Sequence, residues 1–195
     1  KAFAAANASD STDREVFVPA DHVFVIAHIE LDYIVDVTFR IEGTLKINDE
    51  LPLWPKDLGH IGAINFLEAQ HLRIEGAGTI DGQGLMWWRA CYIGKDDRFD
   101  IFRFDQSRWI EVRGLTLLNS PKFHLHFTDC LHIWIENVTI YVDDKLKRGL
   151  GQNKDSVMYP LNTDGIDLSA RNVTVKGCNI TNFDDAIVAK VRQHI

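Results

Sequence analysis

The sequence predicts an all-β protein built as a parallel β-solenoid. A short motif recurs along the chain: an apolar residue, a charged residue, Gly or Asn, and then an alternating strand. The Gly or Asn falls at Gly43, Gly76, Gly114, Asn137 and Gly177, so the copies lie 33, 38, 23 and 40 residues apart. Alternation of period two around each copy is typical of strands with one buried face. No convincing helical pattern runs for more than two turns.

Each copy of the motif predicts a bend between two strands, because Gly and Asn adopt positive φ at low cost. The shortest interval fits one solenoid coil, and the longer ones fit two coils or a coil with an inserted loop. Long loops are expected near residues 54–62, 87–97 and 143–160.

A β-sandwich is the competing all-β architecture, since it also gives short alternating strands separated by turns. A sandwich requires hairpins, however, and tight hairpin turns are scarce here. The pairs Asp81-Gly82 and Asp164-Gly165 are not flanked by two clean strands of equal length. The repeat therefore favours the solenoid.

Composition indicates one globular domain over residues 1–195, with residues 1–20 as an N-terminal arm or cap. Apolar residues make up 46% of the 195 residues and the formal net charge is -7. That charge disfavours a general nucleic-acid binder, which needs a basic surface. No run approaches 18 consecutive apolar residues, so no membrane-spanning helix is expected. Three Cys are too few for a disulfide-stapled scaffold. We expect a monomer without nucleic-acid or membrane partners.

Four Asn-x-Ser/Thr sequons, at Asn7, Asn137, Asn172 and Asn179, are acceptors for N-glycosylation in secreted proteins. Such tripeptides also arise by chance in Thr-rich strands. They give weak support to an extracellular glycoprotein.

Three carboxylates near the C-terminus are the candidate catalytic groups. Asp164 and Asp184 are 20 residues apart, close to one coil, and Asp185 follows directly. Equivalent positions on stacked coils lie ~4.8 Å apart, so the acids are expected to share one site, where repulsion raises one pKa. An acid and a base side by side are what glycoside hydrolysis needs. Adjacent Asp184 and Asp185 can both face one cleft only if the backbone bends; the alternative is a solvated turn.

Several motifs resemble the polygalacturonase family of glycoside hydrolases, family 28, over about residues 35–190. They are Asn-Thr-Asp-Gly-Ile-Asp at 162–167, Asp-Asp at 184–185, a Gly-rich turn at 76–84 followed by Trp87-Trp88, and an Asn-Ser-Pro stretch within 115–124. Their order and spacing together are specific, whereas any one alone is weak.

The resemblance implies a right-handed parallel β-helix in an extracellular enzyme. Members hydrolyse α-1,4-linked galacturonic acid in pectin with inversion and without a metal or other cofactor. By the same resemblance Asp184 corresponds to the general acid, and Asp164 and Asp185 to the pair that activates water. Asn162 corresponds to a residue beside the reacting sugar.

Two further residues are candidate substrate contacts. His124 lies in the segment that borders the substrate groove in the family, and Lys190 is placed to meet a uronate carboxylate. The His-x-His pair at His124 and His126 offers two metal ligands, but no third stands out nearby, so no metal site is expected.

This chain departs from the family pattern at two points. Ala186 stands where the family has Cys, and the sequence reaches Ile195 before the family's Gly-His-Gly and Arg-Ile-Lys motifs. We therefore expect a β-helix truncated on its C-terminal side that is inactive on its own. Two other classes stay open: a calcium-dependent pectate lyase and a non-catalytic, carbohydrate-binding β-solenoid.

Overall fold

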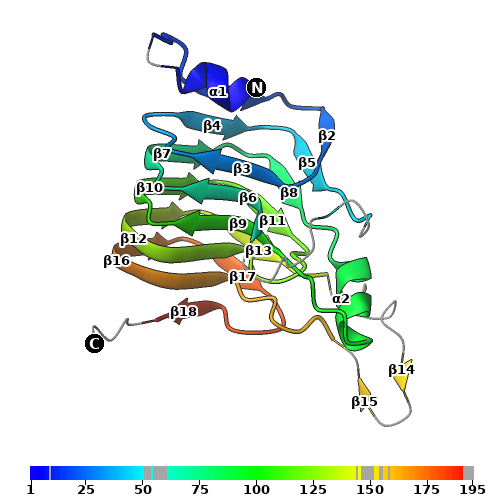
Figure 1. Cartoon of the computed structure of the whole chain (residues 1–195). Coiled ribbons are helices and arrows are strands. Elements are labelled where there is room, and N and C mark those ends of the chain that lie inside the picture. Colours follow the sequence, from blue (N-terminus) through cyan, green and yellow to red (C-terminus); the bar gives the residue numbers. More distant parts are fainter. Residues whose placement is uncertain are drawn as a thin grey trace.

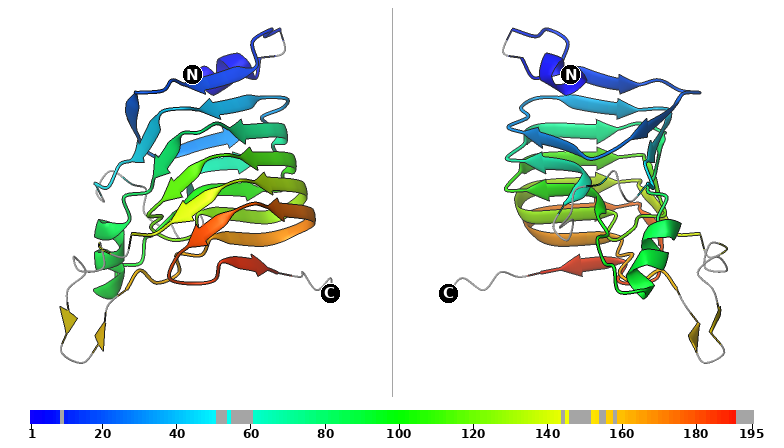
Figure 2. Two further views of the ribbon diagram at one scale, coloured as in Figure 1. Left: turned by 180° about the vertical axis from the view of Figure 1, so that it is seen from behind. Right: turned by 45° about the vertical axis from the view of Figure 1, so that its right-hand side comes forward.

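The chain winds into a stack of coils whose strands pair in parallel, which confirms the predicted parallel β-helix (Figure 1). The computed structural model describes residues 1–8, 10–50, 54, 61–143, 145 and 159–190, and the backbone of residues 152–153 and 156–157. Three faces of stacked strands run along the axis, and both further views in Figure 2 show the same stack.

In the described part of the chain six strands form the first face, and the last two of them directly follow the candidate acids. They are β3 (Ile29–Asp32), β6 (Gly62–Leu67), β9 (Asp100–Asp105), the beginnings of β12 (Leu125–Glu136) and β16 (Ile166–Lys176), and β18 (Ile187–Ala189). In β12 the register shifts between Thr128 and Cys130, and both β12 and β16 continue round the corner into the second face.

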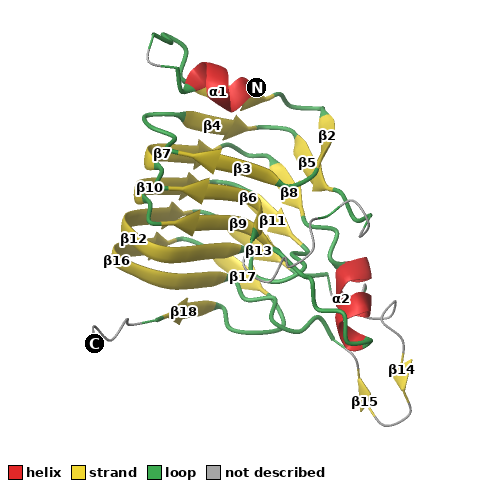
Figure 3. Cartoon of the chain, in the orientation of Figure 1, coloured by secondary structure: helices red, strands yellow, loops and turns green. Residues whose placement is uncertain are grey.

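The second face consists of β1 (Glu15–Val18), β4 (Thr38–Ile41), β7 (Gln70–Glu75), β10 (Arg108–Arg113) and the ends of β12 and β16. The third face consists of β2 (Val23–Ile26), β5 (Thr44–Ile47), β8 (Thr79–Asp81), β11 (Thr116–Leu118), β13 (Thr139–Tyr141) and β17 (Asn179–Thr181). A separate antiparallel pair, β14 (Gln152–Asn153) and β15 (Ser156–Val157), projects from the stack (Figure 3). Strand β1, the first of the second face, lies within residues 1–20, which the sequence predicts to be an N-terminal arm or cap.

The repeated Gly or Asn marks one corner of the helix, as predicted. All five of these residues lie between a second-face strand and the third-face strand that follows it. Gly114, Asn137 and Gly177 have φ of 74, 55 and 65°, in the left-handed region. Gly76 has a φ of 130°, and a Cβ there would come within 2.0 Å of the Ile41 oxygen. The predicted bend is confirmed, because backbone conformation and coil spacing both require these residue types.

The interior is a continuous stack of apolar side chains, in which alternate residues of each strand point inward. Phe66, Phe104 and Phe127, from three successive coils of the first face, are fully buried. The Phe104 ring lies parallel to its two neighbours, with centroids 5.2 Å from Phe66 and 4.6 Å from Phe127.

Two helices accompany the strands. Helix α1 (Ala2–Ala6) lies at one end of the stack, where the Phe3 ring contacts Phe39 edge-on at 4.9 Å (Figure 1). Helix α2 (Leu85–Tyr92) corrects the prediction of a loop beginning at residue 87, since it buries Trp87 and Trp88. It was missed because eight residues without a side-chain N-cap give too short a periodic pattern. Most of the predicted loops at 54–62 and 143–160 lies outside the described residues.

The outer surface of the second face carries a ladder of charges. Arg40, Glu75, Arg113, Glu136 and Lys176 occupy one register position on five successive coils. Their signs alternate along the stack, and ion pairs join Arg40 to Glu75 at 3.5 Å and Lys176 to Glu136 at 3.0 Å. Neighbouring coils are therefore matched in charge as well as in hydrogen bonding.

Among the described residues, no helix has the length and apolar character to cross a membrane.

Candidate active site

Stacking of the last two described coils brings the predicted acids together. Strands β16 and β18 pair in register with Ile166 beside Ile187. Asp164 and Asp185 each lie two residues before these positions, and the Gly165 amide donates to the Asp185 carbonyl at 2.9 Å. The residue equivalent to Asp164 on the next coil is thus Asp185. The expectation that Asp184 would be equivalent was off by one residue, because the coil is one residue longer than the spacing that the sequence suggested.

Asp184 joins the site because the backbone bends at residues 183–184. Its Oδ2 accepts a hydrogen bond from the Asn162 backbone amide at 3.0 Å, and its Oδ1 accepts one from the Asp185 amide at 3.0 Å. One carboxylate oxygen from each of Asp164, Asp184 and Asp185 lies within 4.8 Å of the others. We call these three residues the acid cluster. They can share protons and hold water or a substrate oxygen among them.

Gly165 allows the two coils to approach this closely. A Cβ at this position would come within 2.4 Å of the Ala186 carbonyl oxygen and 2.9 Å of Ile180 Cγ2. Any side chain would push β18 away from β16 and separate Asp164 from Asp185. The close packing of the two coils therefore explains why Gly follows Asp164 in the Asn-Thr-Asp-Gly motif.

Two residues that sequence reasoning did not single out clamp the loops of the acid cluster. The buried Thr163 hydroxyl donates to the Pro160 carbonyl at 3.0 Å and accepts from the Phe183 amide at 3.1 Å. The Asn182 side chain donates to the carbonyls of Thr163 at 3.0 Å and Asp185 at 2.9 Å. Thr163 lies within the Asn-Thr-Asp-Gly motif, and Asn182 lies two residues before the Asp-Asp pair. Their closeness to these motifs was the signal that could have identified them.

Asp164 is the acid whose ionisation is most perturbed. Burial, followed by the negative charge of Asp184, raises the pKa of Asp164 to about 6. Asp167 and Asp185 raise this pKa further, and only 7% of the residue is exposed. Asp164 thus holds a proton at mildly acidic pH that an isolated aspartate would have lost.

Substituting Asp164 with Asn should stabilise the fold at neutral pH. The pKa of Asp164 is about 6 when folded and near 4 when unfolded, so the folded state binds more protons in that interval. Stability is then lost as pH rises from about 4 through 6. We expect Asp164→Asn to be more stable than wild type by about 2 kcal/mol at pH 7 and equal to it below pH ~4. Urea unfolding across this pH range would measure the difference, and a gap that widens toward low pH would contradict it.

His124 lies underneath the acid cluster, with its side chain fully buried. Its Nδ1 lies 2.9 Å from the Asp164 carbonyl oxygen, and the Ser120 amide donates to its Nε2 at 3.4 Å. Nε2 is therefore the acceptor and Nδ1–H donates. Burial lowers the pKa of His124 to about 4, so the ring is neutral. A sugar contact by His124 was expected, but its ring offers no exposed surface here and instead supports the backbone of Asp164.

Lys190 lies at the edge of the site and is engaged by an acid. Its Nζ donates to Oδ2 of the buried Asp167 at 2.6 Å, and it sits 5.6 Å from the centre of the Phe123 ring. Half of the side chain is exposed. Lys190 thus lies at the end of β18 that is farther from Asp185, and its hydrogen bond to Asp167 restrains its charged group.

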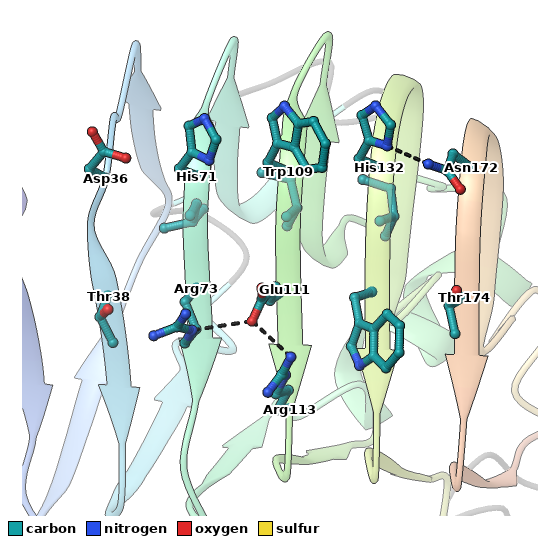
Figure 4. Close-up of a pocket in the computed structure, with 14 residues that line it drawn as sticks. Asp36, Thr38, His71, Arg73, Trp109, Glu111, Arg113, His132, Asn172 and Thr174 are labelled. Atoms are coloured by element: carbon teal, nitrogen blue, oxygen red, sulfur yellow. Dashed lines mark hydrogen bonds and ion pairs between the residues drawn. The ribbon is translucent and has the colours of Figure 1, made fainter.

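A groove of about 670 Å³ on the second face is separate from the acid cluster (Figure 4). The parallel rings of His71, Trp109 and His132 form one of its walls. Several of its polar groups pair with one another: Arg73 and Arg113 both pair with Glu111, and Asn172 bonds His132. The buried Nε of Arg113 has no hydrogen-bond partner among the described residues. None of the predicted site residues lines it.

Three carboxylates this close also have the donor chemistry of a divalent-cation site. Calcium prefers six to eight oxygen ligands, so the acid cluster would supply only part of a coordination shell. The expectation that the site works without a metal therefore stays a prediction.

Known proteins resemble this chain in sequence along most of its length. A "Probable polygalacturonase" of Arabidopsis thaliana is 33% identical over 193 residues, covering 92% of this chain and 36% of the relative. A polygalacturonase of Chamaecyparis obtusa is 29% identical over 160 residues, covering 77% of this chain and 28% of its own length. This chain therefore spans about a third of these relatives.

Solved structures share the fold. The polygalacturonase from Erwinia carotovora ssp. carotovora superposes with a TM-score of 0.69 at 24% identity, over 85% of this chain and 47% of that one. A hyperthermoactive exopolygalacturonase from Thermotoga maritima gives a TM-score of 0.70 at 20% identity, over 90% and 46%. The family model "Glycosyl hydrolases family 28" matches residues 8–194, and the chain belongs to that family as an N-terminal portion of it.

Proposed function

We propose that this chain carries the acid cluster of a secreted polygalacturonase that cleaves α-1,4-galacturonosyl bonds in pectin. The observation that carries the proposal is the convergence of Asp164, Asp184 and Asp185 within 4.8 Å on two stacked coils. Membership of family 28 and the names of the relatives support the substrate class. Hydrolysis needs one acid to protonate the leaving oxygen and one base to activate water.

In the proposed mechanism Asp184 protonates the glycosidic oxygen, while Asp164 and Asp185 orient and deprotonate the attacking water. Burial and the charge of Asp184 raise the pKa of Asp164 to about 6, so Asp164 is ionised and able to take a proton from water above that pH. Asn162, whose backbone amide donates to Asp184, is the proposed contact of the reacting sugar. Lys190 is the proposed partner of a uronate carboxylate at the edge of the site.

The stereochemical course is part of the proposal. The family resemblance favours inversion, in which the carboxyl groups usually stand ~6.5–9.5 Å apart. The oxygens of the acid cluster are closer than this, at a separation nearer to that of retaining enzymes. Proton NMR of the first product formed from an oligogalacturonate distinguishes the two, because inversion releases the β-anomer from an α-linkage.

A lyase is the second candidate, because the same three oxygens could contribute to a calcium site. The two reactions differ in product and in metal requirement. Incubating polygalacturonate with the protein in its natural length should raise reducing ends at a rate unaffected by a chelator. Ultraviolet absorbance from an unsaturated product should stay flat. Loss of activity in chelator together with rising absorbance would assign a lyase and refute hydrolysis.

The 195-residue chain assayed by itself is expected to turn over little substrate. The matched region covers only 36% of one such relative. Lys190, the cation described at the edge of the site, is already bonded to Asp167. Turnover comparable to that of a full-length homologue would show that these residues suffice.

A further inference from the structure

Arg98 is a buried guanidinium in the segment that leads into β9, 64 residues from Asn162 in the sequence. Its side chain is only 2% exposed. A buried cation is tolerated when its charge is paired and its N–H donors are matched. The acceptors that match them connect Arg98 to the acid cluster.

Asp96 anchors the guanidinium from the solvent side. Its carboxylate accepts from Arg98 Nε at 2.7 Å and from Nη2 at 2.9 Å, a bidentate fork. The hydrogen bond from Arg98 lowers the pKa of Asp96, so the pair stays ionised at neutral pH. The fork fixes the plane of the guanidinium and leaves its remaining donors pointing inward.

Those remaining donors hold the loop that precedes Asp164. Nη1 donates to the Leu161 carbonyl, and Nη2 donates to Oδ1 of Asn162 at 3.1 Å. Asn162 has a φ of 54°, in the left-handed region. Arg98 therefore restrains both the backbone and the side chain of a residue in a sparsely populated conformation.

The contact with Arg98 decides which way the Asn162 amide faces. Because its oxygen accepts from Arg98, its Nδ2 is turned toward Asp184 Oδ2, 3.5 Å away. The Asn162 backbone amide donates to the same oxygen at 3.0 Å. With the amide reversed, its oxygen would face a carboxylate and its nitrogen a guanidinium, and both contacts would be repulsive.

We propose that Arg98 is a positioning residue of the acid cluster, which orients Asn162 so that its N–H groups hold Asp184 beside Asp164. Arg98 touches none of the three acids and acts through Asn162. The inference rests on the proposed function only in treating Asp184 as a working part of the site.

Arg98→Lys tests this role in the 195-residue chain by NMR. Lysine keeps the charge but cannot make the fork and reach Asn162 at once. We expect the side-chain amide protons of Asn162 to exchange with water at least about tenfold faster, because they lose their fixed orientation. The titration midpoint of the Asp164 carboxyl carbon should also fall below its starting value, since Asp184 is no longer held next to it.

Arg103→Lys is the matched control. Arg103 makes the same kind of fork, with Asp105 at 2.8 and 3.1 Å, and its other partners are His126 and Thr128 on β12 and Asp100, 3.8 Å away. It should leave the Asn162 exchange rate and the Asp164 midpoint unchanged. Equal effects of the two Arg→Lys changes would reduce Arg98 to a general contributor to stability and overturn the proposal.

Two further variants make the result independent of how well Arg98→Lys folds. Asp96→Asn loosens the guanidinium from its exposed side and should move both readouts in the same direction by less. In an Asn162→Ala background, Arg98→Lys should not move the Asp164 midpoint further. A further shift there, or an unchanged Asn162 amide in Asp96→Asn, would show that Arg98 does not act through Asn162. None of these readouts requires turnover, so a failed hydrolase assay and a failed positioning role are told apart.

Discussion

Asp184→Asn is expected to lower the kcat of polygalacturonate hydrolysis by about 10²–10⁴-fold in the natural-length protein. Asn has the shape of Asp and still accepts a hydrogen bond from the Asn162 amide, so the loop should keep its conformation. It carries no acidic proton, and the leaving oxygen must then depart unprotonated. A reducing-end assay at saturating substrate measures the loss.

Asp32→Asn is the control for this change, because Asp32 is an exposed aspartate at the end of β3, near the opposite end of the stack. Its rate should equal that of wild type. If Asp184→Asn retains the wild-type kcat while the protein still hydrolyses pectin, the acid cluster has been assigned the wrong role. A non-catalytic, carbohydrate-binding solenoid would predict that substrate binding is also unaffected.

Phe104→Ala is expected to cost about 3–5 kcal/mol of unfolding free energy, the largest stability effect that we predict. The ring is fully buried between Phe66 and Phe127, so truncation leaves a cavity in the middle of the stack and exposes two neighbouring rings to it. Each coil of a solenoid is stabilised mainly by its neighbours, so one missing layer weakens the interfaces on both sides. Urea unfolding followed by tryptophan fluorescence would measure the change.

Phe17→Ala removes the same side chain from β1, where it is 52% exposed. It should cost less than about 1 kcal/mol. Comparable losses for the two substitutions would mean that burial in the stack does not determine the stability of this fold. A smaller loss in Phe104→Ala than in Phe17→Ala would contradict the prediction outright.

The corner between the second and third faces was predictable because its residue types are restricted. Gly76 and Asn137 adopt backbone conformations that most residues avoid, so the corner leaves a repeat in the sequence. The corner between the first and second faces leaves no such repeat. Two of its left-handed residues, Glu68 and Gln106, have a φ of 52°, yet neither belongs to a type that signals a turn. Pairing with adjacent coils offsets the local cost.

The acid cluster was predictable as a group but not in its detail. Spacing brought Asp164 near Asp184 and Asp185, whereas the register of β16 and β18 decided which of the two was equivalent. The contact between Arg98 and Asn162 spans 64 residues and carries no local signal. The burial of His124 also depends on a neighbouring coil, which explains why a supporting residue resembled a ligand contact from the sequence.

The ladder of opposite charges on the second face limits how coils can be added to or removed from this β-helix. Deleting or duplicating any one coil between Arg40 and Lys176 would set two cations or two anions against each other at a spacing of ~4.8 Å. Gain or loss of two coils together would preserve the sequence of signs. We therefore expect insertions and deletions in this part of the β-helix to add or remove two coils at a time.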